Sequence, residues 1–288
     1  MEKYNNFGAL EESFTDPDTS EIAVLSVPYD ETSTWIKGAD KGPLAIIKAS
    51  SALEVYDIET DSEVYKKGIY TCPAIKTNAS PEDMSGEVEN KVSGLINAGK
   101  FVVILGGEHS VSIGAIKAHN SKFKDLSVLQ FDAHADLRDE YEGSKYNHAC
   151  VMARVKEIAP FVQVGIRSMS VEEKDKLDAS STFFAKDING GDIWINKVVE
   201  KLTSNVYVSI DLDVFDPSIM PSTGTPEPGG LTWYQVLRLL KAVSESKNVV
   251  GFDVVELCPM ENNSAPDFAA AKLIYKFLSY IYENRSKK

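Results

Sequence analysis

Six runs of apolar, mainly β-branched residues divide this 288-residue chain, and longer amphipathic stretches separate them. The runs are EIAVLSVPYD (21–30), FVVILGG (101–107), LSVLQFDAH (126–134), FVQVGIRS (161–168), NVYVSIDLD (205–213) and NVVGFDVVEL (248–257). They are apolar at most positions, which is typical of strands whose two faces are both buried. Because helix-like stretches alternate with them, the pattern predicts an α/β fold with a mainly parallel sheet.

Three of the intervening stretches carry helix signals. Residues 81–100 open with proline and acidic residues and close at Gly99, as helix termini often do. Residues 231–246 have Thr232 as a candidate N-cap and apolar residues at helical spacing. Residues 265–284 read as a C-terminal amphipathic helix. Such helices would cover both faces of the sheet, in a three-layer α/β/α arrangement.

The chain has no Pro/Gly/Ser-rich linker, internal repeat or low-complexity tract, so residues 1–288 are expected to form a single domain. No apolar run approaches the length of a membrane span. The N-terminal sequence MEKYNNFGALEESFTD is polar and acidic, without an apolar signal core. We therefore expect a cytoplasmic protein that does not bind membranes.

The net charge and the cysteine spacing argue against a nucleic-acid-binding protein, a disulfide-stabilised fold and a zinc knuckle. A formal net charge of −13 argues against nucleic acid as a partner and is compatible with a cationic substrate. Cys72, Cys150 and Cys258 are far apart and form no CxxC pair, so neither a disulfide framework nor a zinc knuckle is indicated. We expect all three to be reduced and mostly buried.

Titratable residues stand at the ends of four of the six runs. Sites in a parallel sheet form at the carboxyl ends of its strands, so these residues are candidates for a site. They are Glu108 and His109 after the second run, Asp132, His134 and Asp136 at the third, Asp211 and Asp213 at the fifth, and Asp253 and Glu256 at the sixth.

The candidate site is rich in carboxylates. Side chains at alternate positions share one face of a strand, so neighbouring strands would bring together Asp132, Asp136, Asp211 and Asp213. Four negative charges would repel each other or bind protons unless two divalent cations neutralised them. Oxygen ligands with histidine and no thiolate suit Mn²⁺. Two such ions can share a water and lower its pKa, so the pattern predicts hydrolysis of a poor electrophile.

With these residues identified, the chain resembles a known family. FDAHAD, SIDLDVFDP, GGEHS and GFDVVEL look like the four signature segments of the ureohydrolases, the arginase–agmatinase family. Residues 27–50 resemble the N-terminal segment of that family, and the similarity extends from about residue 21 to the C-terminal helix. The resemblance implies the three-layer arginase–deacetylase fold and a homo-oligomer, either a trimer or a hexamer.

The resemblance also implies roles for individual residues, including two Mn²⁺ per subunit. His148, in KYNHACVM, matches the catalytic histidine that moves protons near the leaving amine. Glu256 matches the acid that holds the guanidinium, a pairing that suits a planar and always-charged group. The implied metal ligands are His109 and Asp136 on one ion, His134 and Asp213 on the other, and Asp132 and Asp211 bridging both.

The substrate is expected to be a small cationic guanidine. Glu227, in TPEPGG, makes residues 209–232 more similar to agmatinases than to arginases, which typically have an apolar residue there. The arginase run Ser-Gly-Asn-x-His is replaced by SerLysTyrAsnHis (144–148), which weakens the case for arginine. We therefore predict hydrolysis of agmatine to putrescine and urea, as in polyamine biosynthesis. Aminopropylagmatine, arginine, guanidinobutyrate and formiminoglutamate remain alternatives.

Other readings of the site stay open. A one-zinc deacetylase on the same fold needs fewer carboxylates, and a non-catalytic module would not need His148 or Glu256. Asp-x-His also occurs in metallophosphoesterases, but their Gly-Asn-His-Asp/Glu block is missing. The chain departs from the usual family pattern at Glu108, where Asp is common, and at 38–43. His119 is expected on the surface at a helix end, and Asp253 in a structural hydrogen bond.

Overall fold

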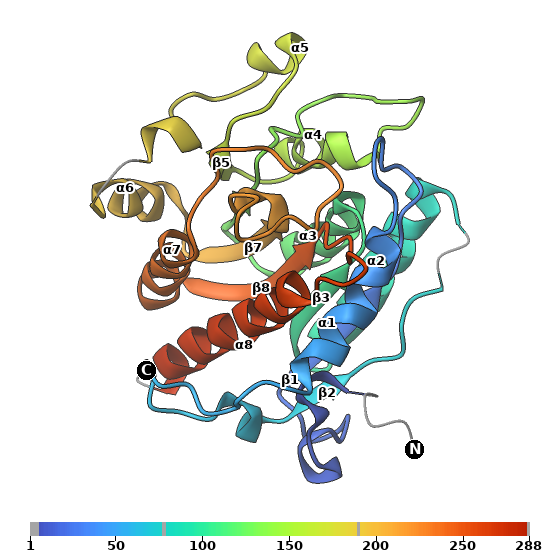
Figure 1. Ribbon diagram of the computed structural model, residues 1–288, viewed down its shortest axis with the longest axis vertical. Helices are drawn as coiled ribbons and strands as arrows, with labels where there is room; N and C mark the ends of the chain where they lie inside the picture. Colours follow the sequence, from blue (N-terminus) through green and yellow to red (C-terminus); the bar gives the residue numbers. More distant parts are fainter. Residues whose placement is uncertain (1–5, 77–78, 189–190, 287–288) are drawn as a thin grey trace.

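A computed structural model describes residues 6–76, 79–188 and 191–286 of the chain. Within these ranges an eight-stranded, entirely parallel sheet lies between two layers of helices (Figure 1). The strand order is β2-β1-β3-β8-β7-β4-β5-β6. The strands are β1 Ile22–Val27, β2 Ile69–Thr71, β3 Phe101–Gly106, β4 Leu126–Phe131, β5 Phe161–Ile166, β6 Thr182–Phe184, β7 Asn205–Asp211 and β8 Asn248–Val255.

The helices divide between the two faces of the sheet, as the predicted three-layer arrangement requires. One face packs against α2 (Pro81–Asn97), α3 (Ser112–Lys122) and α4 (Val151–Lys156). The other face packs against α1 (Gly42–Ser50), α6 (Ile193–Lys201), α7 (Trp233–Ser246) and α8 (Ala265–Ser286). The short helix α5 (Val171–Lys174) lies away from the sheet, at the end where several strand–helix loops gather (Figure 1).

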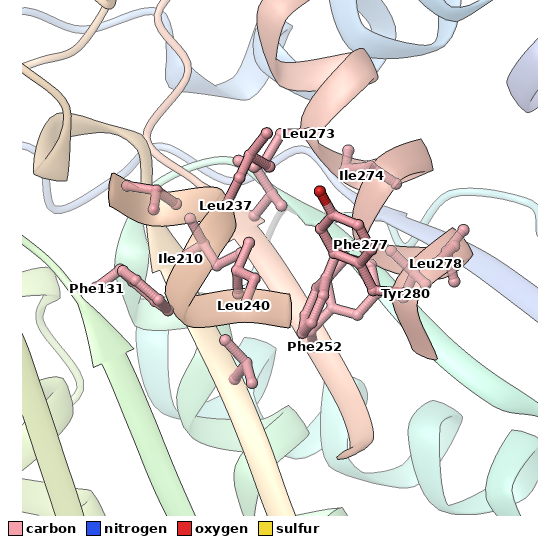
Figure 2. Close-up of a cluster of buried hydrophobic side chains, with 14 of the residues drawn as sticks. Phe131, Ile210, Leu237, Leu240, Phe252, Leu273, Ile274, Phe277, Leu278 and Tyr280 are labelled. Carbon is pink, nitrogen blue, oxygen red and sulfur yellow. The ribbon is translucent and has the colours of Figure 1, made fainter. Parts of the chain in front are cut away.

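Both faces of the central strands are buried, which explains why the sequence runs are apolar throughout. In β4, Leu129 and Phe131 belong to the core on the α7–α8 side, whereas Leu126 and Val128 belong to the core on the α2–α3 side. Figure 2 shows the first of these cores, where Phe131, Ile210 and Phe252 of the sheet meet side chains of α7 and α8. Each large apolar side chain buried in this way contributes about 1.5–3 kcal/mol.

Local signals set the helix boundaries. Thr232 caps α7 through its side chain, which accepts from Gln235 N, and Gln235 reaches back to the Thr232 backbone in a capping box. α2 begins after Ser80, which accepts from Asp83 N. The three predicted helices are present. The strands β2 and β6, of three residues each, were not predicted, because so short a segment at a sheet edge leaves no apolar run.

His119 is the clear departure from the sequence prediction. It was expected at the surface, but its side chain is fully buried between α3 and the sheet. Its Nδ1 donates to the Ala115 carbonyl at 2.7 Å, and its ring packs on Tyr207 with 4.7 Å between centroids. A Cβ on Gly251 would lie 2.3 Å from His119 Nε2, so only glycine fits beneath the ring. Burial lowers the pKa of His119 to about 4, so the ring is neutral.

Two further expectations can be compared with the structure. Cys72, Cys150 and Cys258 are all buried and unpaired, as predicted. None of the helices in the described ranges combines the length and the apolar character that crossing a membrane would require.

Candidate metal centre and pocket

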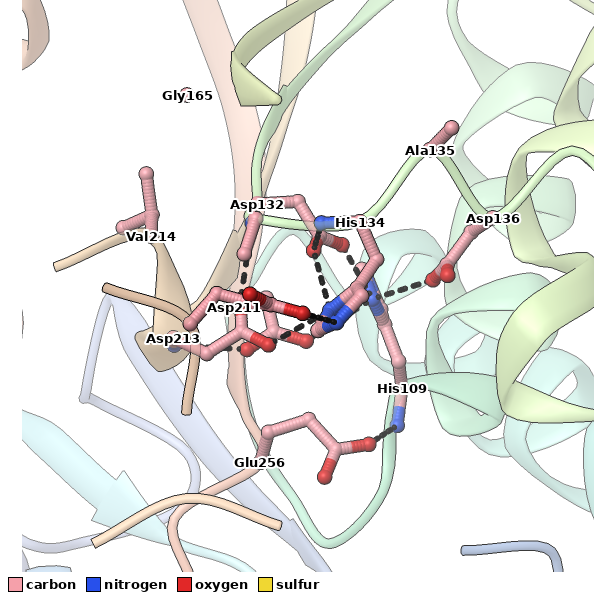
Figure 3. Close-up of polar contacts among 12 residues, drawn as sticks. His109, Asp132, His134, Ala135, Asp136, Gly165, Asp211, Asp213, Val214 and Glu256 are labelled. Carbon is pink, nitrogen blue, oxygen red and sulfur yellow. Dashed lines mark hydrogen bonds and ion pairs between the residues drawn. The ribbon is translucent and has the colours of Figure 1, made fainter. Parts of the chain in front are cut away.

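The predicted metal ligands gather at the carboxyl ends of neighbouring strands. β4 and β7 are adjacent, with Phe131 opposite Ile210, so the next residues, Asp132 and Asp211, stand side by side. β8 adjoins β7 on the other side, and β3 adjoins β8, which brings His109 to the same place. Figure 3 shows the side chains converging from these elements. The predicted residues therefore lie on neighbouring strands, at one edge of the sheet.

Asp132 lies between the two histidines. Its Oδ2 is 3.1 Å from His109 Nδ1, and its Oδ1 is 3.6 Å from His134 Nδ1 (Figure 3). The carboxylate is fixed by two donors, because Gln130 Nε2 donates to Oδ2 at 2.7 Å and the His134 amide donates to Oδ1 at 2.6 Å. A carboxylate held in this way presents one oxygen to each side, as a bridging ligand would.

Two groups of side chains around Asp132 have ligand atoms close enough to hold metal ions. One group is His109, Asp132 and Asp211, and the other is Asp132, His134 and Asp213. In the first, His109 Nδ1 is 3.4 Å from Asp211 Oδ2; in the second, His134 Nδ1 is 2.9 Å from Asp213 Oδ2. The two groups share Asp132, so the site has room for a pair of ions.

Asp136 completes the set of six. Its Oδ2 lies 3.1 Å from His109 Nδ1, so it approaches the first group from the loop after β4. The residue has a φ of 51°, a left-handed conformation that is uncommon outside glycine. Its carbonyl accepts from the amides of Met152 and Ala153 at the start of α4. Asp136 lies beyond the end of β4, so the alternation of side chains along a strand does not determine its direction. The loop positions it instead.

The donor set fits divalent cations. His109 Nδ1 is buried without a hydrogen bond, and it faces carboxylate oxygens of Asp132, Asp136 and Asp211 at 3.1–3.4 Å. Lone pairs facing each other at this distance need a proton or a metal ion between them. Among the described residues no lysine or arginine forms an ion pair with these aspartates.

Without cations, the site would have to take up protons. Burial raises the pKa of Asp136 to about 7, and the neighbouring charge of Asp132 adds to that effect. Burial also raises the pKa of Asp211 well above its ordinary value, together with the charges of Asp213 and Asp132. Burial alone would lower the pKa of His109, but the three carboxylates around it raise that pKa well above its usual value. Divalent ions would replace these protons.

A chain of hydrogen bonds holds His109 from behind. Its Nε2 is 2.9 Å from Ser209 Oγ, which donates to Asp253 Oδ1 at 2.7 Å. Tyr207 donates to the other oxygen of Asp253 at 2.8 Å. Asp253 makes the structural hydrogen bonds expected of it. Its connection to His109 through Ser209 was not predicted, because it depends on the pairing of β7 with β8.

A pocket of about 260 Å³ opens over the candidate metal centre. His109, His134, Asp136, Asp211 and Asp213 line it together with the predicted His148 and Glu256. Large apolar side chains stand at its margin, where Trp35 is 74% exposed, Ile36 44% and Met169 41%. The charged groups are therefore reached past an apolar rim.

Glu256 is a buried acid without a basic partner among the described residues. It follows β8 in a left-handed conformation with φ 66°, which turns its side chain toward the site. Its Oε1 accepts from the His109 amide at 2.7 Å (Figure 3). Burial raises its pKa well above the ordinary value, and the nearby charge of Glu108 adds to this. A cationic ligand in the pocket would relieve that cost.

His148 lies in the pocket wall at the start of a short 3₁₀ turn, His148–Cys150. The ring of Tyr141 meets it edge-on with 6.4 Å between centroids. Its Nδ1 is 3.2 Å from Thr32 Oγ1. Burial lowers the pKa of His148 to about 4. Cys150, the last residue of this turn, is fully buried.

Three other residues near the pocket were not foreseen in these positions. Arg138 lines the pocket, with its Nε 3.7 Å from Glu173 Oε2 and its guanidinium stacked 4.2 Å from the Tyr141 ring centroid. Arg167 donates to the carbonyl of Glu227 at 2.8 Å and to that of Asp213 at 2.6 Å, which ties the two loops together. The Glu227 carboxylate then lies 3.9 Å from His134 Nε2. Pairings of this kind between distant loops leave no local sequence signal.

Comparisons with known proteins agree with this geometry. The family model described as "Arginase family" matches residues 20–279. The N(1)-aminopropylagmatine ureohydrolase of Synechocystis sp. is 38% identical, over 96% of this chain and 94% of that protein. The agmatinase of Pyrococcus horikoshii is 35% identical, over 94% and 95% respectively. The solved structure of the agmatine ureohydrolase of Thermoplasma volcanium superposes with a TM-score of 0.87 at 33% identity, covering 95% of this chain and 94% of that one.

Proposed function

This chain belongs to the arginase family of ureohydrolases, and from that premise we propose that it hydrolyses the guanidinium of a decarboxylated linear guanidine. The proposed substrates are agmatine, which would give putrescine and urea, and its N(1)-aminopropyl derivative. The observation that carries the proposal is the position of Glu256, an acid without a basic partner in the same pocket as the six candidate ligands.

Glu256 supports a cationic substrate through its environment. One of its oxygens is occupied by the His109 amide, and the other lies beside Gly224, where an added Cβ would be 3.6 Å away. A guanidinium entering the pocket would supply the positive charge that this buried carboxylate lacks. It would be held in the pocket that the candidate metal ligands line, which would orient its central carbon for attack by water.

The six ligands are proposed to hold two Mn²⁺ ions. When bound, such a pair lowers the pKa of a water and polarises the group that the water attacks. Following the resemblance, His109 and Asp136 would hold one ion, His134 and Asp213 would hold the other, and Asp132 and Asp211 would serve both; in the structure, Asp132 is the residue common to the two ligand groups.

His148 is proposed to serve the proton transfer. It lines the pocket without belonging to either ligand group, so its ring is free for acid–base work. The products of guanidinium hydrolysis are urea and an amine, and the leaving nitrogen must gain a proton before it departs. His148 would deliver that proton, and Glu256 would keep the rest of the guanidinium in place.

The length of the substrate is the finer part of the proposal. Relatives named for N(1)-aminopropylagmatine and for agmatine both align over more than nine-tenths of this chain. The apolar rim of Trp35, Ile36 and Met169 suits the methylene chain of either compound. Since the aminopropyl compound is the longer of the two, it would cover more of this rim on binding.

One observation favours a second candidate. Arg138 lines the pocket, and a basic residue there would suit a guanidine with a carboxylate tail, such as guanidinobutyrate. The buried carboxylate of Glu173 lies 3.7 Å from the Arg138 side chain and offsets part of its charge. For this reason the decarboxylated guanidines remain the first choice.

The broader setting is also proposed. We expect residues 1–288 to fold as one ureohydrolase domain that works in the cytoplasm as a homo-oligomer, a trimer or a hexamer. A role in polyamine biosynthesis would follow from release of putrescine or of its aminopropylated form. Nucleic acid and membranes are not expected as partners, since the net charge is −13.

The test is urea release by the Mn²⁺-loaded protein with four substrates side by side: agmatine, aminopropylagmatine, arginine and guanidinobutyrate. Preference for either of the first two supports the proposal, and their ratio decides the chain length. Preference for guanidinobutyrate would support the role of Arg138 and overturn the choice of substrate. No urea from any of the four, with two ions bound, would overturn the proposed function.

A further inference from the structure

Behind His148 lies a set of hydrogen bonds that neither the resemblance nor the proposed mechanism uses. Thr32 belongs to the loop after β1, and its hydroxyl meets His148 twice: it accepts from the His148 amide at 3.0 Å and lies 3.2 Å from the ring Nδ1. The same hydroxyl lies 2.6 Å from Glu108 Oε1. Thr32 therefore connects the pocket histidine to a buried acid that is 0% exposed.

Glu108 is surrounded by donors. Its Oε2 accepts from the Thr32 amide at 2.5 Å, and its Oε1 accepts from the Thr32 hydroxyl at 2.6 Å and the Ser110 hydroxyl at 2.5 Å. Burial raises the pKa of Glu108, and the hydrogen bonds from Ser110 and Thr32 act against that change. Three donors around two oxygens suit a carboxylate, which can only accept.

The hydroxyl of Thr32 then has no hydrogen left for His148. A hydroxyl has one hydrogen to donate and two lone pairs that accept. The hydrogen goes to Glu108, and one lone pair takes the His148 amide. The second lone pair faces His148 Nδ1, so that contact is a hydrogen bond only if Nδ1 carries a hydrogen. The one hydrogen and the two lone pairs of the hydroxyl are then all used in hydrogen bonds.

We propose that Thr32, oriented by Glu108, is a positioning residue that fixes His148 in the tautomer with hydrogen on Nδ1. In the neutral ring, Nε2 is then the nitrogen with the free lone pair. Nε2 makes no hydrogen bond to any residue in the described ranges, and His148 lines the pocket. The free nitrogen can thus take up the proton that the attacking water loses and pass it to the leaving amine. This inference rests on the proposed function of His148.

The chain carries the features that this arrangement needs. A glutamate at 108 reaches the amide and the hydroxyl of Thr32 together, whereas aspartate, common at this place in the family, is one methylene shorter. Gly107 permits the close approach, since a Cβ there would lie 2.0 Å from the Tyr29 carbonyl. The Glu108 amide donates to that same carbonyl at 2.8 Å, which fixes the loop against β3.

The experiment reads the tautomer directly. The full-length protein, labelled with ¹⁵N at histidine and loaded with diamagnetic Zn²⁺, gives separate imidazole signals because the chain has four histidines. His119 is an internal control, since its Nδ1 donates to the Ala115 carbonyl and no variant below touches it. His148 is assigned by its loss in His148→Asn. In the wild type we expect His148 to carry its hydrogen on Nδ1, as His119 does.

Two variants test the role of Thr32. Thr32→Val removes the hydroxyl and keeps the shape, so the His148 tautomers should become mixed while His119 is unchanged. We expect kcat for urea release by the Mn²⁺ form to fall about 10- to 100-fold, with KM unchanged. A correctly positioned acid–base group contributes about 10²–10⁴-fold to the rate, and loss of its orientation should remove part of that contribution. Thr32→Ser keeps the hydroxyl, and it should restore both the tautomer and kcat.

The outcomes separate the two proposals. A wild-type His148 with its hydrogen on Nε2, or a Thr32→Val protein with unchanged tautomer and kcat, overturns the positioning role and leaves the proposed function standing. A wild type that binds two ions but releases no urea overturns the proposed function, while the tautomer measurement still tests the contact of Thr32 with His148. If Thr32→Val does not fold, Thr32→Ser decides, since loss of the Nδ1 tautomer there contradicts the inference.

Discussion

Two clusters of acids in the described part of the chain are neutralised differently, and each contains buried carboxylates. In the Lys276 cluster, defined here as Lys276, Asp57 and Glu59, the lysine of α8 lies 3.0 Å from Asp57 and 3.2 Å from Glu59. In the metal-centre cluster, defined as the six candidate ligands, no described lysine or arginine forms an ion pair with the aspartates. One cluster contains a lysine, and the other has only histidines beside its aspartates.

The pKa of Asp57 in the first cluster and those of Asp136 and Asp211 in the second move in opposite directions, whereas the pKa of Asp132 is lowered by the two histidines beside it. Burial tends to raise the pKa of Asp57, but the hydrogen bond and charge of Lys276 outweigh it, and the pKa falls below its ordinary value. For Asp136, burial and the charge of Asp132 together raise the pKa to about 7. Buried acids are therefore not by themselves a sign of function. Acids that keep a raised pKa, with no lysine or arginine of the described residues paired to them, mark a place for an outside cation.

The largest effect should come from removing one carboxylate of the candidate metal centre. We expect Asp211→Asn to weaken Mn²⁺ binding more than about 100-fold, because loss of a group that merely supports a ligand already costs 10–100-fold. Urea release should fall by at least as much. Titration calorimetry with Mn²⁺ measures the first and the urea assay the second. Normal turnover in a sample shown to be free of metal would contradict the mechanism.

The same variant also tests the electrostatic contrast. In metal-free protein Asp211 must either take up a proton or repel Asp213 and Asp132, so replacing it by neutral asparagine should leave thermal stability unchanged or raise it. A clear fall in the melting temperature of the metal-free variant would mean that Asp211 stabilises the fold by itself, and the distinction between the two clusters would be lost.

The second largest effect should be a loss of folding stability when Lys276 is replaced. Lys276→Met keeps the length and the apolar part of the side chain but leaves Asp57 and Glu59 without their cation. Breaking a buried ion pair costs about 3–5 kcal/mol, so the free energy of unfolding should fall by that amount. Urea denaturation measures it. The folded fraction should keep its Mn²⁺ affinity, since Lys276 makes no contact with the metal-centre cluster.

The sequence predicted the strand ends of the metal centre well, because the pattern there is local. Asp132 and Asp211 end apolar runs, and the adjacency of β4 and β7 brings them together. The turn that directs Glu256 into the pocket was not predictable, because GFDVVEL contains no sequence signal for a left-handed residue at Glu256, where φ is 66°. Its role came from the resemblance.

Contacts between distant segments could not be read from the sequence. Thr32 and Glu108 are 76 residues apart, and Lys276 and Asp57 are 219 apart. The prediction for His119 was wrong for the same reason. Its position near the end of a helix suggested an exposed side chain, but Tyr207 of β7 and Gly251 of β8 enclose it. Each of these contacts depends on which strands are neighbours, and periodicity along the chain does not give that order.

A smaller effect is expected from the support of His109. Ser209→Ala removes the hydroxyl between His109 Nε2 and Asp253, so the His109 ring loses its orienting partner. We expect affinity for one of the two Mn²⁺ ions to fall about 10-fold, the lower end for such supporting groups. Tyr207→Phe is the matched control, because it removes the other hydrogen bond of Asp253 and leaves Ser209 in place. Equal losses in both variants would argue against a specific role for the Ser209 contact.

The smallest effect should be the change with pH in the stability that the Lys276 cluster contributes. The pKa values of Asp57 and Glu59 in the folded protein lie below their ordinary values of 3.8 and 4.5. A lowered pKa means that the stabilisation is fully present above the ordinary value and is lost as the pH falls through the folded one. The stability difference between wild type and Lys276→Met should therefore be constant above about pH 5 and shrink below pH 4. Urea midpoints of both proteins between pH 3 and pH 6 measure it, and the metal-centre acids, common to both, cancel. A difference that stays constant down to pH 3 would show that Lys276 stabilises α8 by packing alone, and the cluster would no longer serve as the self-neutralised counterpart of the metal centre.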